Sequence, residues 1–470
     1  MRAAAAHKKT RRKRGGRFIS SGANGCGFAE PALRCLGEPV PPSNIFSKMT
    51  TIKEAESEYR IAATIREIDP DQKFSIYPTR VCEPDPSQPD NEVYECPLIH
   101  TLKINNSKRF RLLHMKMGGT SLYNKVFEPD SAVQIFESIV PVMEGLTQMH
   151  ARNYYHLDIK DENMVIDSLN KIRLIDFGNA LFARDFIEGK PRTGVFGNYL
   201  YWPYEMRWLE RGRFPIFKQA FKLNSSWLQE DFTTFFNNGP YRLSRTIPPN
   251  IYYDSPTKAY ANVDLMGEIF EKVMGHYGGY TEQLVGDLLG KIDVYSLAIL
   301  LCAMYIAIFG QHAVFTKDND AIIVQAYNPQ QNTYYSKTLR EKGANETRKT
   351  MTRIRDKIST PFYDLMYDML ELNPLDRLSM ADATMKYKKW LAEMKIVMGD
   401  TEVMGAVSSH LSAESPVLKN ISPSQDKPIV AGVKRRRNNV AGNAGNQKRT
   451  RRNLRNLSVS AIEATENEHQ

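Results

Sequence analysis

Two hydrophobic patterns follow one another along the chain and predict regions of different structure. Lys53 to Ile68 repeats apolar residues at helical spacing and ends at Asp69-Pro70, so a helix is predicted there. Residues 74–81, 96–104 and 110–115 are short apolar runs separated by turn-forming residues, which predicts antiparallel strands. The first part of the chain therefore favours a small β structure with one helix.

From about residue 130 the pattern becomes helical. Apolar positions between Asp130 and Met149 predict a second helix, with a kink at Pro141. Val294 to Phe309 is almost entirely apolar, but its 16 residues fall short of a membrane span. A bilayer requires about 20 residues, so a buried core helix is expected. After about Gly405, polar residues, Pro and Gly replace the periodicity, which predicts a disordered tail.

The strongest candidate for chemistry lies between the second helix and a predicted hairpin. It reads His156-Leu157-Asp158-Ile159-Lys160-Asp161-Glu162-Asn163, and two apolar runs then lead to Asp176-Phe177-Gly178. Because a hairpin brings its two ends together, Asp158, Asn163 and Asp176 are expected to converge. Phosphoryl transfer needs oxygen ligands for Mg²⁺, a carboxylate that orients the attacking hydroxyl, and a nearby cation. This segment supplies all of these groups.

The segment resembles the catalytic loop and metal-binding motif of eukaryotic-type protein kinases. The resemblance implies that Asp158 is the catalytic base and that Lys160 steadies the γ-phosphate. By the same match, Asn163 and Asp176 hold Mg²⁺, with Mn²⁺ as the alternative ion, and ATP is the other cofactor. The implied fold class is α+β, with a small, mainly antiparallel β lobe carrying one helix and a larger, mainly α lobe. The competing interpretation is an Asp-rich turn beside a buried strand.

Two later segments resemble kinase motifs in the expected order. Residues 197–205 resemble the end of an activation segment, and residues 373–377 resemble the loop whose arginine pairs with its glutamate. Glu205 and Arg377 are therefore a predicted buried ion pair. Asp293 resembles the first residue of the central helix, where it would accept hydrogen bonds from the catalytic-loop backbone. Taken singly, these positions would be ordinary loop residues.

The residues before 119 resemble the nucleotide-binding half of a kinase. Phe18 to Phe28 resembles a glycine-rich phosphate loop, with Gly22 and Gly25 in matching positions, Ser20 in place of the first glycine and Gly27 where valine is usual. Lys48 is the candidate lysine for phosphate contact, and Glu58 is its expected partner, although the gap of ten residues is short. Residues 112–119 resemble the strand and hinge that bind adenine, with Met115 and Met117 as the candidate positions. A glycine linker and solvated surface charges are the alternatives.

The resemblance covers about residues 17–395 and sets the expected domains. Residues 1–16 form a basic disordered arm, 17–400 the kinase domain, and 401–470 a disordered basic tail. The small lobe spans about 17–118 and the large lobe about 119–400, with an insertion at about 207–285. Small-lobe segments, among them Pro31-Ala32-Leu33-Arg34-Cys35, are similar to serine/threonine kinases of large nucleocytoplasmic DNA viruses. That similarity implies a viral kinase in the host cytoplasm or nucleus, or in the virion.

Three departures or details refine the expected activity. Leu157 replaces the arginine that in many kinases pairs with a phosphorylated activation loop, so activity without phosphorylation of residues 179–200 is expected. Lys160, two residues after the base, fits kinases that act on serine and threonine. The insertion is rich in aromatic residues that should pack on the large lobe or bind a partner: Trp208, Phe214, Phe217, Phe221, Trp227, Phe232, Phe235 and Phe236.

Charge is concentrated at the two ends of the chain. The 63 basic and 53 acidic residues give +10, but residues 1–17 and 434–455 hold seventeen basic and no acidic residues, which leaves about −7 for the rest. The tracts at 7–14 and 434–455 are candidates for nuclear import or nucleic-acid contact, and a solvated tail is the alternative. A kinase-fold scaffold without turnover and a protein that binds nucleic acid through its tails therefore remain competing functions.

Cysteine usage and the N-terminus bear on the compartment. The five cysteines are scattered and form no CxxC pair, so all are expected to be reduced thiols. Ala3 to Ala6 is too short an apolar core for a secretory signal. An intracellular protein that is neither secreted nor bound to a membrane is expected.

Overall fold

The computed structural model describes most of the region between residues 17 and 399. The described residues are 17–22, 25–86, 93–98, 109–125, 127, 131–189, 201–209, 212–223, 228, 263–308, 316–318, 321–328, 333–339 and 355–399. All of them belong to the first of the two units into which the chain divides, residues 1–414 and 415–470. The predicted arm, the predicted tail with its basic tracts, and most of the activation segment lie outside the described residues.

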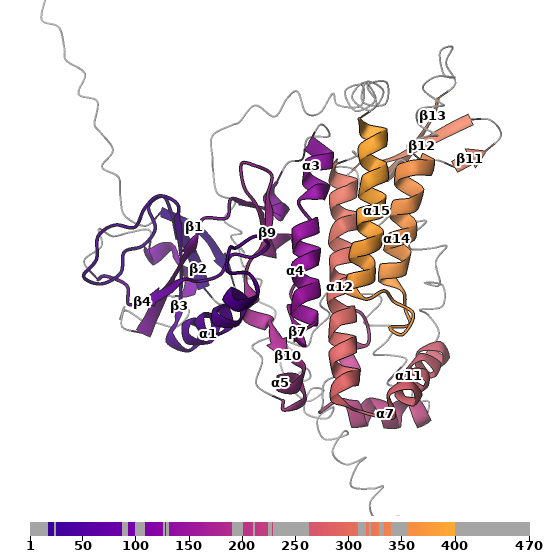
Figure 1. Ribbon diagram of the computed structural model, residues 1–470, viewed down its shortest axis with the longest axis horizontal. Helices are drawn as coiled ribbons and strands as arrows, with labels where there is room; N and C mark the ends of the chain where they lie inside the picture. Colours follow the sequence, from indigo (N-terminus) through magenta and orange to yellow (C-terminus); the bar gives the residue numbers. More distant parts are fainter. Residues whose placement is uncertain are drawn as a thin grey trace, which may run out of the picture. The chain divides into compact units, whose positions relative to one another are not determined.

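A five-stranded antiparallel sheet forms the small lobe (Figure 1). Its strands, in spatial order, are β1 (Arg17–Gly22), β2 (Gly25–Ala29), β3 (Ile45–Thr51), β5 (Phe110–Lys116) and β4 (Arg80–Cys82). Helix α1 (Ile52–Ile68) follows β3, and the Thr51 hydroxyl caps it by accepting the Glu54 N–H at 3.4 Å. The predicted helix and the α+β class with one helix in a β lobe are confirmed.

One of the three predicted small-lobe strands is largely wrong, and a second is not extended where it is described. Of the run at 74–81, only residues 80 and 81 lie in a strand, β4, because the Asp69 carboxylate accepts the N–H groups of Phe74 and Ser75 and holds a turn. Residues 93–95 form a short 3₁₀ turn, η1 (Val93–Glu95), and residues 96–98 are not extended. Residues 99–104 lie outside the described residues.

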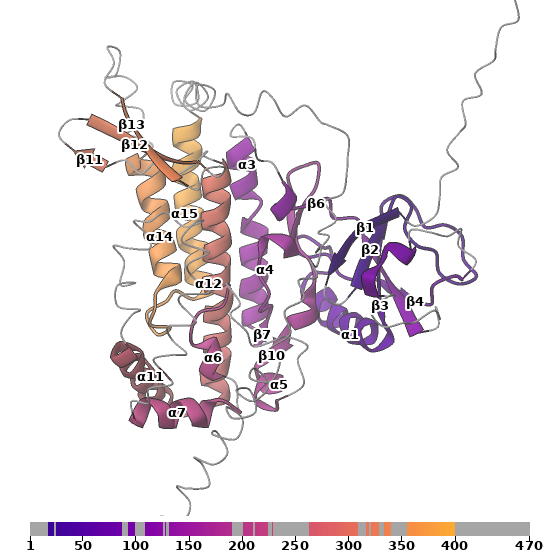
Figure 2. The same ribbon diagram turned by 180° about the vertical axis from the view of Figure 1, so that it is seen from behind.

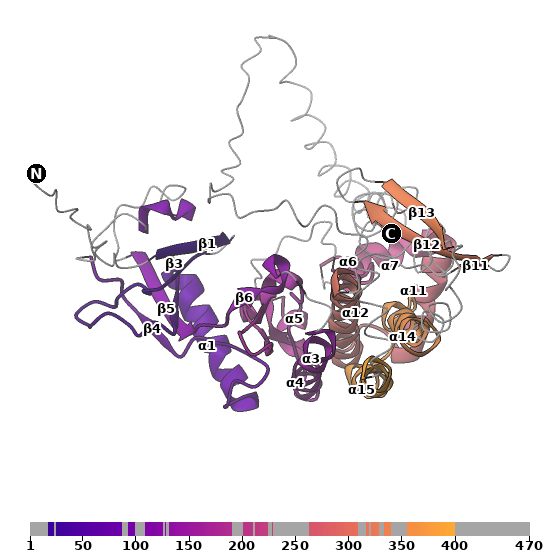
Figure 3. The same cartoon turned by 90° about the horizontal axis from the view of Figure 1, so that it is seen from above.

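The large lobe is mainly helical (Figures 2 and 3). Its longer helices are α4 (Val140–His150), α11 (Val263–Tyr277), α12 (Glu282–Ile308), α14 (Thr360–Leu370) and α15 (Met380–Met398). Shorter helical segments are η3 (Leu122–Asn124), α3 (Ala132–Glu137), η5 (Asp161–Asn163), η6 (Phe177–Asn179), α5 (Ala183–Ile187), α6 (Met206–Leu209), α7 (Phe214–Leu223) and the π turn η8 (Arg355–Ser359). Helix α12 packs against α14 and α15, and α15 also packs against α4, so these four helices enclose the largest apolar core.

The large lobe also contains two small sheets, one of which includes the hairpin between the predicted catalytic segments. Strands β6 (Thr120–Ser121), β8 (Met164–Ile166) and β9 (Ile172–Leu174) form one small sheet, and β7 (Tyr154–Tyr155) pairs with β10 (Leu181–Phe182). The predicted hairpin is therefore present as β8 and β9. A further antiparallel sheet of β11 (Thr316–Asp318), β12 (Ala321–Asn328) and β13 (Thr333–Leu339) was not predicted for this helix-rich region.

The structure shifts two of the predicted helix boundaries. The helix expected over 130–149 is divided at Ser138 and Ile139, and Pro141 lies in the first turn of α4, where its missing N–H removes no helical hydrogen bond. The central helix begins at Glu282, eleven residues before Asp293, because the Thr281 hydroxyl accepts the Leu284 N–H at 3.1 Å and caps it there.

Helix α12 is a buried core helix, as the apolar run at 294–309 predicts. Among the described residues, it is the one helix long and apolar enough to cross a membrane, and 78% of that stretch is buried inside the fold. Val294, Leu297 and Leu301 are each completely buried. Its hydrophobicity is therefore explained by the core that it fills.

The described part of the aromatic insertion packs on the large lobe. Trp208, Phe214 and Phe217 are buried, and the half-buried Phe221 stacks on Phe270 of α11 at 4.8 Å between ring centroids. Packing, the first of the two expected roles, thus accounts for these four aromatic residues. The expected Trp227, Phe232, Phe235 and Phe236 lie outside the described residues.

The prediction that all five cysteines are reduced is wrong for four of them. Cys26 is bonded to Cys96, and Cys35 is bonded to Cys82, while Cys302 is free and buried. The partners are 70 and 47 residues apart in sequence, so their pairing depends on how the small lobe folds. Spacing alone could not show it.

The predicted ion pair between Glu205 and Arg377 is present and buried. Arg377 Nη1 lies 2.5 Å from Glu205 Oε1, and their side chains are 1% and 2% exposed. The same guanidinium donates to the Glu371 carbonyl at 2.8 Å and the Lys291 carbonyl at 3.2 Å. A buried ion pair is stable only when hydrogen bonds replace the hydration that its charged groups lose. This pair therefore holds the end of the predicted activation segment on the helical lobe.

We expect Arg377→Met to lower the free energy of unfolding by about 3–5 kcal/mol, because Glu205 would be left as an unpaired buried charge. Urea denaturation would measure this loss, and Glu205→Gln in the same chain should recover much of it. The control is Lys386→Met, since Lys386 pairs with Asp368 at 2.6 Å where both side chains are 46% exposed. That exposed pair should contribute less than about 1 kcal/mol. Equal losses in the two single variants would contradict the expectation.

Candidate active site

A buried carboxylate holds the backbone of the predicted catalytic loop. Asp293 is completely buried, and its two oxygens accept the N–H groups of His156 at 2.9 Å and Leu157 at 2.8 Å. His150 Nε2 lies 3.0 Å from the same carboxylate. Leu157 has a φ of 60°, a left-handed conformation that is costly for this residue type. The hydrogen bonds that the loop donates to Asp293 therefore stabilise a strained turn directly before Asp158.

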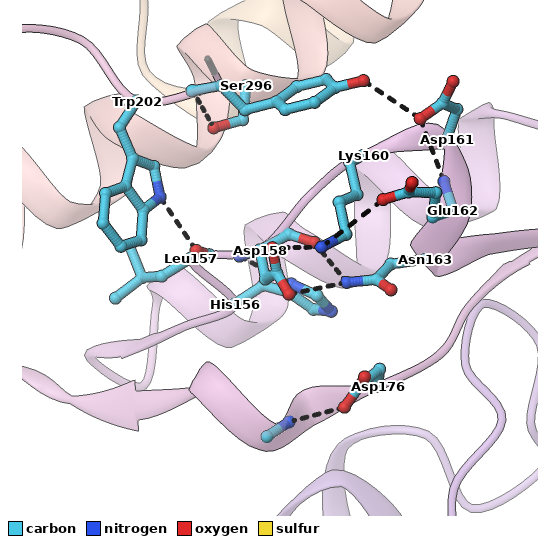
Figure 4. Close-up of polar contacts among 12 residues, drawn as sticks. His156, Leu157, Asp158, Lys160, Asp161, Glu162, Asn163, Asp176, Trp202 and Ser296 are labelled. Carbon is cyan, nitrogen blue, oxygen red and sulfur yellow. Dashed lines mark hydrogen bonds and ion pairs between the residues drawn. The ribbon is translucent and has the colours of Figure 1, made fainter. Parts of the chain in front are cut away.

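The catalytic-loop side chains meet at one point (Figure 4). Asn163 Nδ2 donates to Asp158 Oδ2 at 2.8 Å and to the Asp158 carbonyl at 2.9 Å. Lys160 Nζ lies 3.2 Å from Asp158 Oδ1. Because the Asn163 amide nitrogen is used on Asp158, its oxygen is the atom left for a cation.

The β8–β9 hairpin brings Asp176 beside this group. The Ile175 N–H donates to the Asn163 carbonyl at 2.9 Å, which joins the two ends of the hairpin. Asp176 has a φ of 57°, and its carboxylate accepts the Gly178 N–H at 3.4 Å. The next residue, Phe177, is buried with its ring 4.9 Å from that of His156. Packing of Phe177 thus fixes the turn that presents the Asp176 carboxylate, and the expected convergence of Asp158, Asn163 and Asp176 is observed.

Lys48 joins the two lobes electrostatically. Its Nζ lies 2.8 Å from Glu58 Oε1 on α1 and 3.4 Å from Asp176 Oδ1. Burial alone would lower the pKa of Lys48, but the charges of Asp176 and Glu58 outweigh it and raise that pKa, so the ammonium stays protonated. The Lys48 charge in turn lowers the pKa of Asp176. Burial raises the pKa of Glu58, and the Lys48 charge opposes that shift.

Phe46 explains the unusual glycine in the predicted phosphate loop. Strands β1 and β2 form the predicted hairpin, with Gly22 opposite Gly25, while residues 23–24 lie outside the described residues. A Cβ placed on Gly27 would lie 2.4 Å from Cζ of Phe46. Glycine is therefore required at 27 by the Phe46 ring, which joins an apolar cluster that includes Met115, Val165 and Ile175. Sequence analysis did not find Phe46, which lies two residues before Lys48.

The predicted hinge is present, but one of its backbone groups is engaged. Met115 is buried at the end of β5, opposite Phe46 in the sheet. Met117 follows the strand, and its N–H donates to the Asn44 carbonyl at 2.8 Å. A nucleotide that used the Met117 N–H would have to replace this hydrogen bond.

A further set of contacts that sequence analysis missed links the predicted catalytic loop to the last part of the predicted activation segment. The Tyr201 hydroxyl donates to Asp161 Oδ1 at 3.0 Å, and the Ser296 hydroxyl donates to the Tyr201 carbonyl at 2.7 Å. Trp202 Nε1 donates to the Leu157 carbonyl at 2.9 Å. These bonds fix the segment that ends at Glu205 next to Asp158 (Figure 4).

The donor set suits a divalent cation that prefers oxygen. Asp176 supplies a carboxylate whose pKa is lowered, and Asn163 supplies an amide oxygen at the adjoining end of the hairpin. Sulfur and imidazole ligands, which softer metals prefer, are not part of this set. Mg²⁺ thus fits these residues, and so does Mn²⁺.

Comparison with known proteins agrees with this geometry. Residues 95–206 match the protein kinase domain family. The serine/threonine-protein kinase PSK1 of Saccharomyces cerevisiae is 40% identical over 43 residues, 9% of this chain and 3% of that protein. The striated muscle preferentially expressed protein kinase of Danio rerio is 45% identical over 42 residues, 9% of this chain and 1% of that protein.

A longer similarity reaches a plant protein. CBL-interacting protein kinase 9 of Oryza sativa subsp. japonica is 29% identical over 90 residues, 18% of this chain and 19% of that protein. The chain thus spans less than a fifth of the length of each of these relatives. The family match over residues 95–206 and the α+β architecture are consistent with a two-lobed protein kinase-like fold.

We expect Gly27→Val to reduce the free energy of unfolding by about 1–3 kcal/mol, because the added side chain overlaps the Phe46 ring. Phe46→Ala opens that space, so the double variant should be more stable than the sum of the two single effects predicts. Denaturant titration of all three variants measures the coupling. Gly212→Ala is the control, since no atom lies within 4 Å of its added Cβ. Additive effects of Gly27→Val and Phe46→Ala would show that the Phe46 ring does not exclude a side chain at position 27.

Proposed function

We propose that the chain is a protein kinase that transfers the γ-phosphoryl group of ATP to serine or threonine hydroxyls. The observation that carries this proposal is the continuous set of contacts from Glu58 through Lys48 to Asp176, beside the Asp158 and Asn163 pair. Such a set places a cation, metal-binding oxygens and the Asp158 carboxylate around one point. Phosphoryl transfer depends mainly on this kind of positioning and charge stabilisation.

The residues divide the work according to their surroundings. Asp158, fixed by Asn163, would accept a hydrogen bond from the substrate hydroxyl, orient it, and take its proton as the new bond forms. Lys160 lies next to Asp158, where its ammonium would neutralise charge on the γ-phosphoryl group during transfer. Lys48 would bind the phosphates that are not transferred. When bound through Asp176 and Asn163, Mg²⁺ supplies neutralisation of the phosphate charge.

The nucleobase would lie against the apolar cluster on the small-lobe side of Lys48. This cluster includes Phe46, Met115 and Val165, so it joins residues of β3, β5 and β8. Glycines in the β1–β2 hairpin would allow backbone N–H groups to approach the phosphates. The serine/threonine preference rests on Lys160 and on the similarity to PSK1, which is named as a serine/threonine-protein kinase.

The biological setting is part of the same proposal. From the resemblance of small-lobe segments such as residues 31–35 to viral kinases, we propose a kinase made during infection and packaged in the virion. Disulfides persist where the environment is oxidising, and the reducing cytosol and nucleus disfavour them. Of the proposed locations, the virion therefore suits the two disulfides best.

Asp158→Asn should lower phosphotransfer from radiolabelled ATP to generic protein substrates by at least about 100-fold, because the amide cannot accept the hydroxyl proton. Asp167→Asn is the matched control. Asp167 lies in the turn at the opposite end of the same hairpin, where it pairs with Arg173 at 3.0 Å. Its substitution should change the rate by no more than about twofold. Undiminished transfer in Asp158→Asn would contradict the assigned role, and an inert wild-type chain would favour a scaffold without turnover.

Activity should not depend on phosphorylation of the activation segment. Leu157 is buried in an apolar cluster, where the phosphate-pairing arginine of many kinases would carry a charge. We therefore expect Thr193→Ala to retain the wild-type rate within about twofold; Thr193 itself lies outside the described residues. The measurement is the phosphotransfer rate of phosphatase-treated wild type and variant. A chain that becomes active only when Thr193 is phosphorylated would contradict this expectation.

A further inference from the structure

The small lobe holds a second cluster of groups with metal-binding chemistry, away from the site above. One ligand atom from each of Cys35, Cys82 and His114 lies within 4.8 Å of the other two. Cys35 and His114 are buried, and Cys82 is half-buried. Within the described parts of the chain, no other group of three or more His, Cys, Asp or Glu ligands is found at this spacing.

The hydrogen bonding of His114 leaves one ring nitrogen available as a ligand. Nε2 lies 2.9 Å from the Leu33 carbonyl, and because a carbonyl can only accept, Nε2 carries the proton. Nδ1 therefore keeps its lone pair, and it lies 3.8 Å from Cys35 Sγ. Metal-binding histidines characteristically donate their other N–H to a carbonyl or carboxylate in this way.

The three segments are held in place by contacts other than the bond between the sulfurs. Cys82 on β4 pairs with Leu112 of β5, the strand that carries His114. The segment around Cys35 is fixed to the residues after β4, because the Leu36 N–H donates to the Glu83 carbonyl at 2.9 Å. Arg34 and Asp85 add a salt bridge at 2.8 Å. Opening the disulfide would therefore leave the three ligand side chains close together.

We propose that, once the Cys35–Cys82 disulfide is reduced, the two thiolates and His114 Nδ1 bind one Zn²⁺ ion, with water as the fourth ligand. Zinc bonds of about 2.3 Å to sulfur and about 2.0 Å to nitrogen place these atoms about 3.5 Å apart in a tetrahedral site. Cys35 Sγ lies 3.8 Å from Nδ1 and 3.9 Å from Nε2 of His114, and all three ligand atoms lie within 4.8 Å of one another. Once their bond is broken, the two sulfurs must move apart, and small side-chain rotations would then place them around one ion.

The chemical step balances with a dithiol as the reductant. The dithiol donates two electrons and two protons, which break the sulfur–sulfur bond and yield two thiols, and it becomes a disulfide itself. Zinc then displaces both thiol protons to solvent. In the reverse direction, a second disulfide would accept the two electrons and two protons from solvent and become a dithiol, which re-forms the Cys35–Cys82 bond and releases the ion. The pair of cysteines would therefore hold either zinc or a covalent bond.

The other disulfide offers an internal comparison. Cys26 and Cys96 are both buried, and no histidine or carboxylate ligand among the described residues accompanies them at comparable spacing. A reduced Cys26 and Cys96 pair supplies two ligands, fewer than the three or four that zinc sites use. Zinc binding that requires His114 and Cys82, and not Cys96, is therefore the signature of the proposed site.

The full-length chain, reduced with a phosphine that does not compete for metals, can be titrated with Co²⁺ as a spectroscopic substitute for Zn²⁺. Wild type and Cys96→Ser should bind one ion per chain, with sulfur-to-cobalt charge-transfer absorption and tetrahedral bands that Zn²⁺ abolishes. Cys82→Ser and His114→Gln should weaken binding at least about tenfold. Unreduced wild type should show no such bands. Equal binding by His114→Gln and wild type, or equal loss in Cys96→Ser, would overturn the proposal.

A second measurement needs no substitution and so does not depend on any variant folding. Reduced wild type is alkylated with and without Zn²⁺, and the modified cysteines are identified by mass spectrometry. Zinc should slow alkylation of Cys35 and Cys82 at least about tenfold, because a metal-bound thiolate is less reactive, and should leave Cys26 and Cys96 unchanged. Equal rates at Cys35 and Cys82 with and without zinc would overturn the proposal. Neither readout involves phosphotransfer, so the result is independent of the proposed kinase activity.

Discussion

The Asp293 carboxylate is the constraint on which the candidate active site depends. A completely buried carboxylate is stable only when hydrogen bonds replace its lost hydration, and the backbone of His156 and Leu157 provides them. In return, those two hydrogen bonds hold Leu157 in a left-handed conformation that its side chain disfavours. Asp158 directly follows that turn, so a buried residue outside the loop sets the backbone geometry of the candidate site.

The parts of the site that sequence could predict are those carried by short segments. Residues 156–163 and 176–178 each carry their candidate functional side chains within a few positions of one another. The hairpin between them could be predicted because two apolar runs flank a turn. The pairing of Glu58 with Lys48 followed from helical phase, since Glu58 shares a face of α1 with the buried Ile65. Glu205 and Arg377 were joined only through their resemblance to kinase motifs, because 172 residues separate them.

What sequence could not predict depends on contacts between distant strands. The disulfides require β2 and β4 to reach partners far along the chain, and no local pattern encodes that approach. No local sequence pattern explains the glycine at position 27. The Phe46 ring on the neighbouring strand occupies the space that a side chain at this position would fill. The early start of α12 could have been predicted from the sequence, since a set of apolar residues repeats at helical spacing before Asp293. They are all buried: Leu284, Val285, Leu288 and Leu289.

Helix α12 has a further consequence because it serves two cores in succession. Its first half, including Leu284 and Ile292, packs in the aromatic core formed with α7 and α11, whereas its second half from Val294 packs in the core of α4, α14 and α15. Asp293 lies at the boundary between the two. The inserted helices α7 and α11 therefore pack on the same helix that carries Asp293, so a change in how the insertion packs would reach the loop before Asp158 through α12.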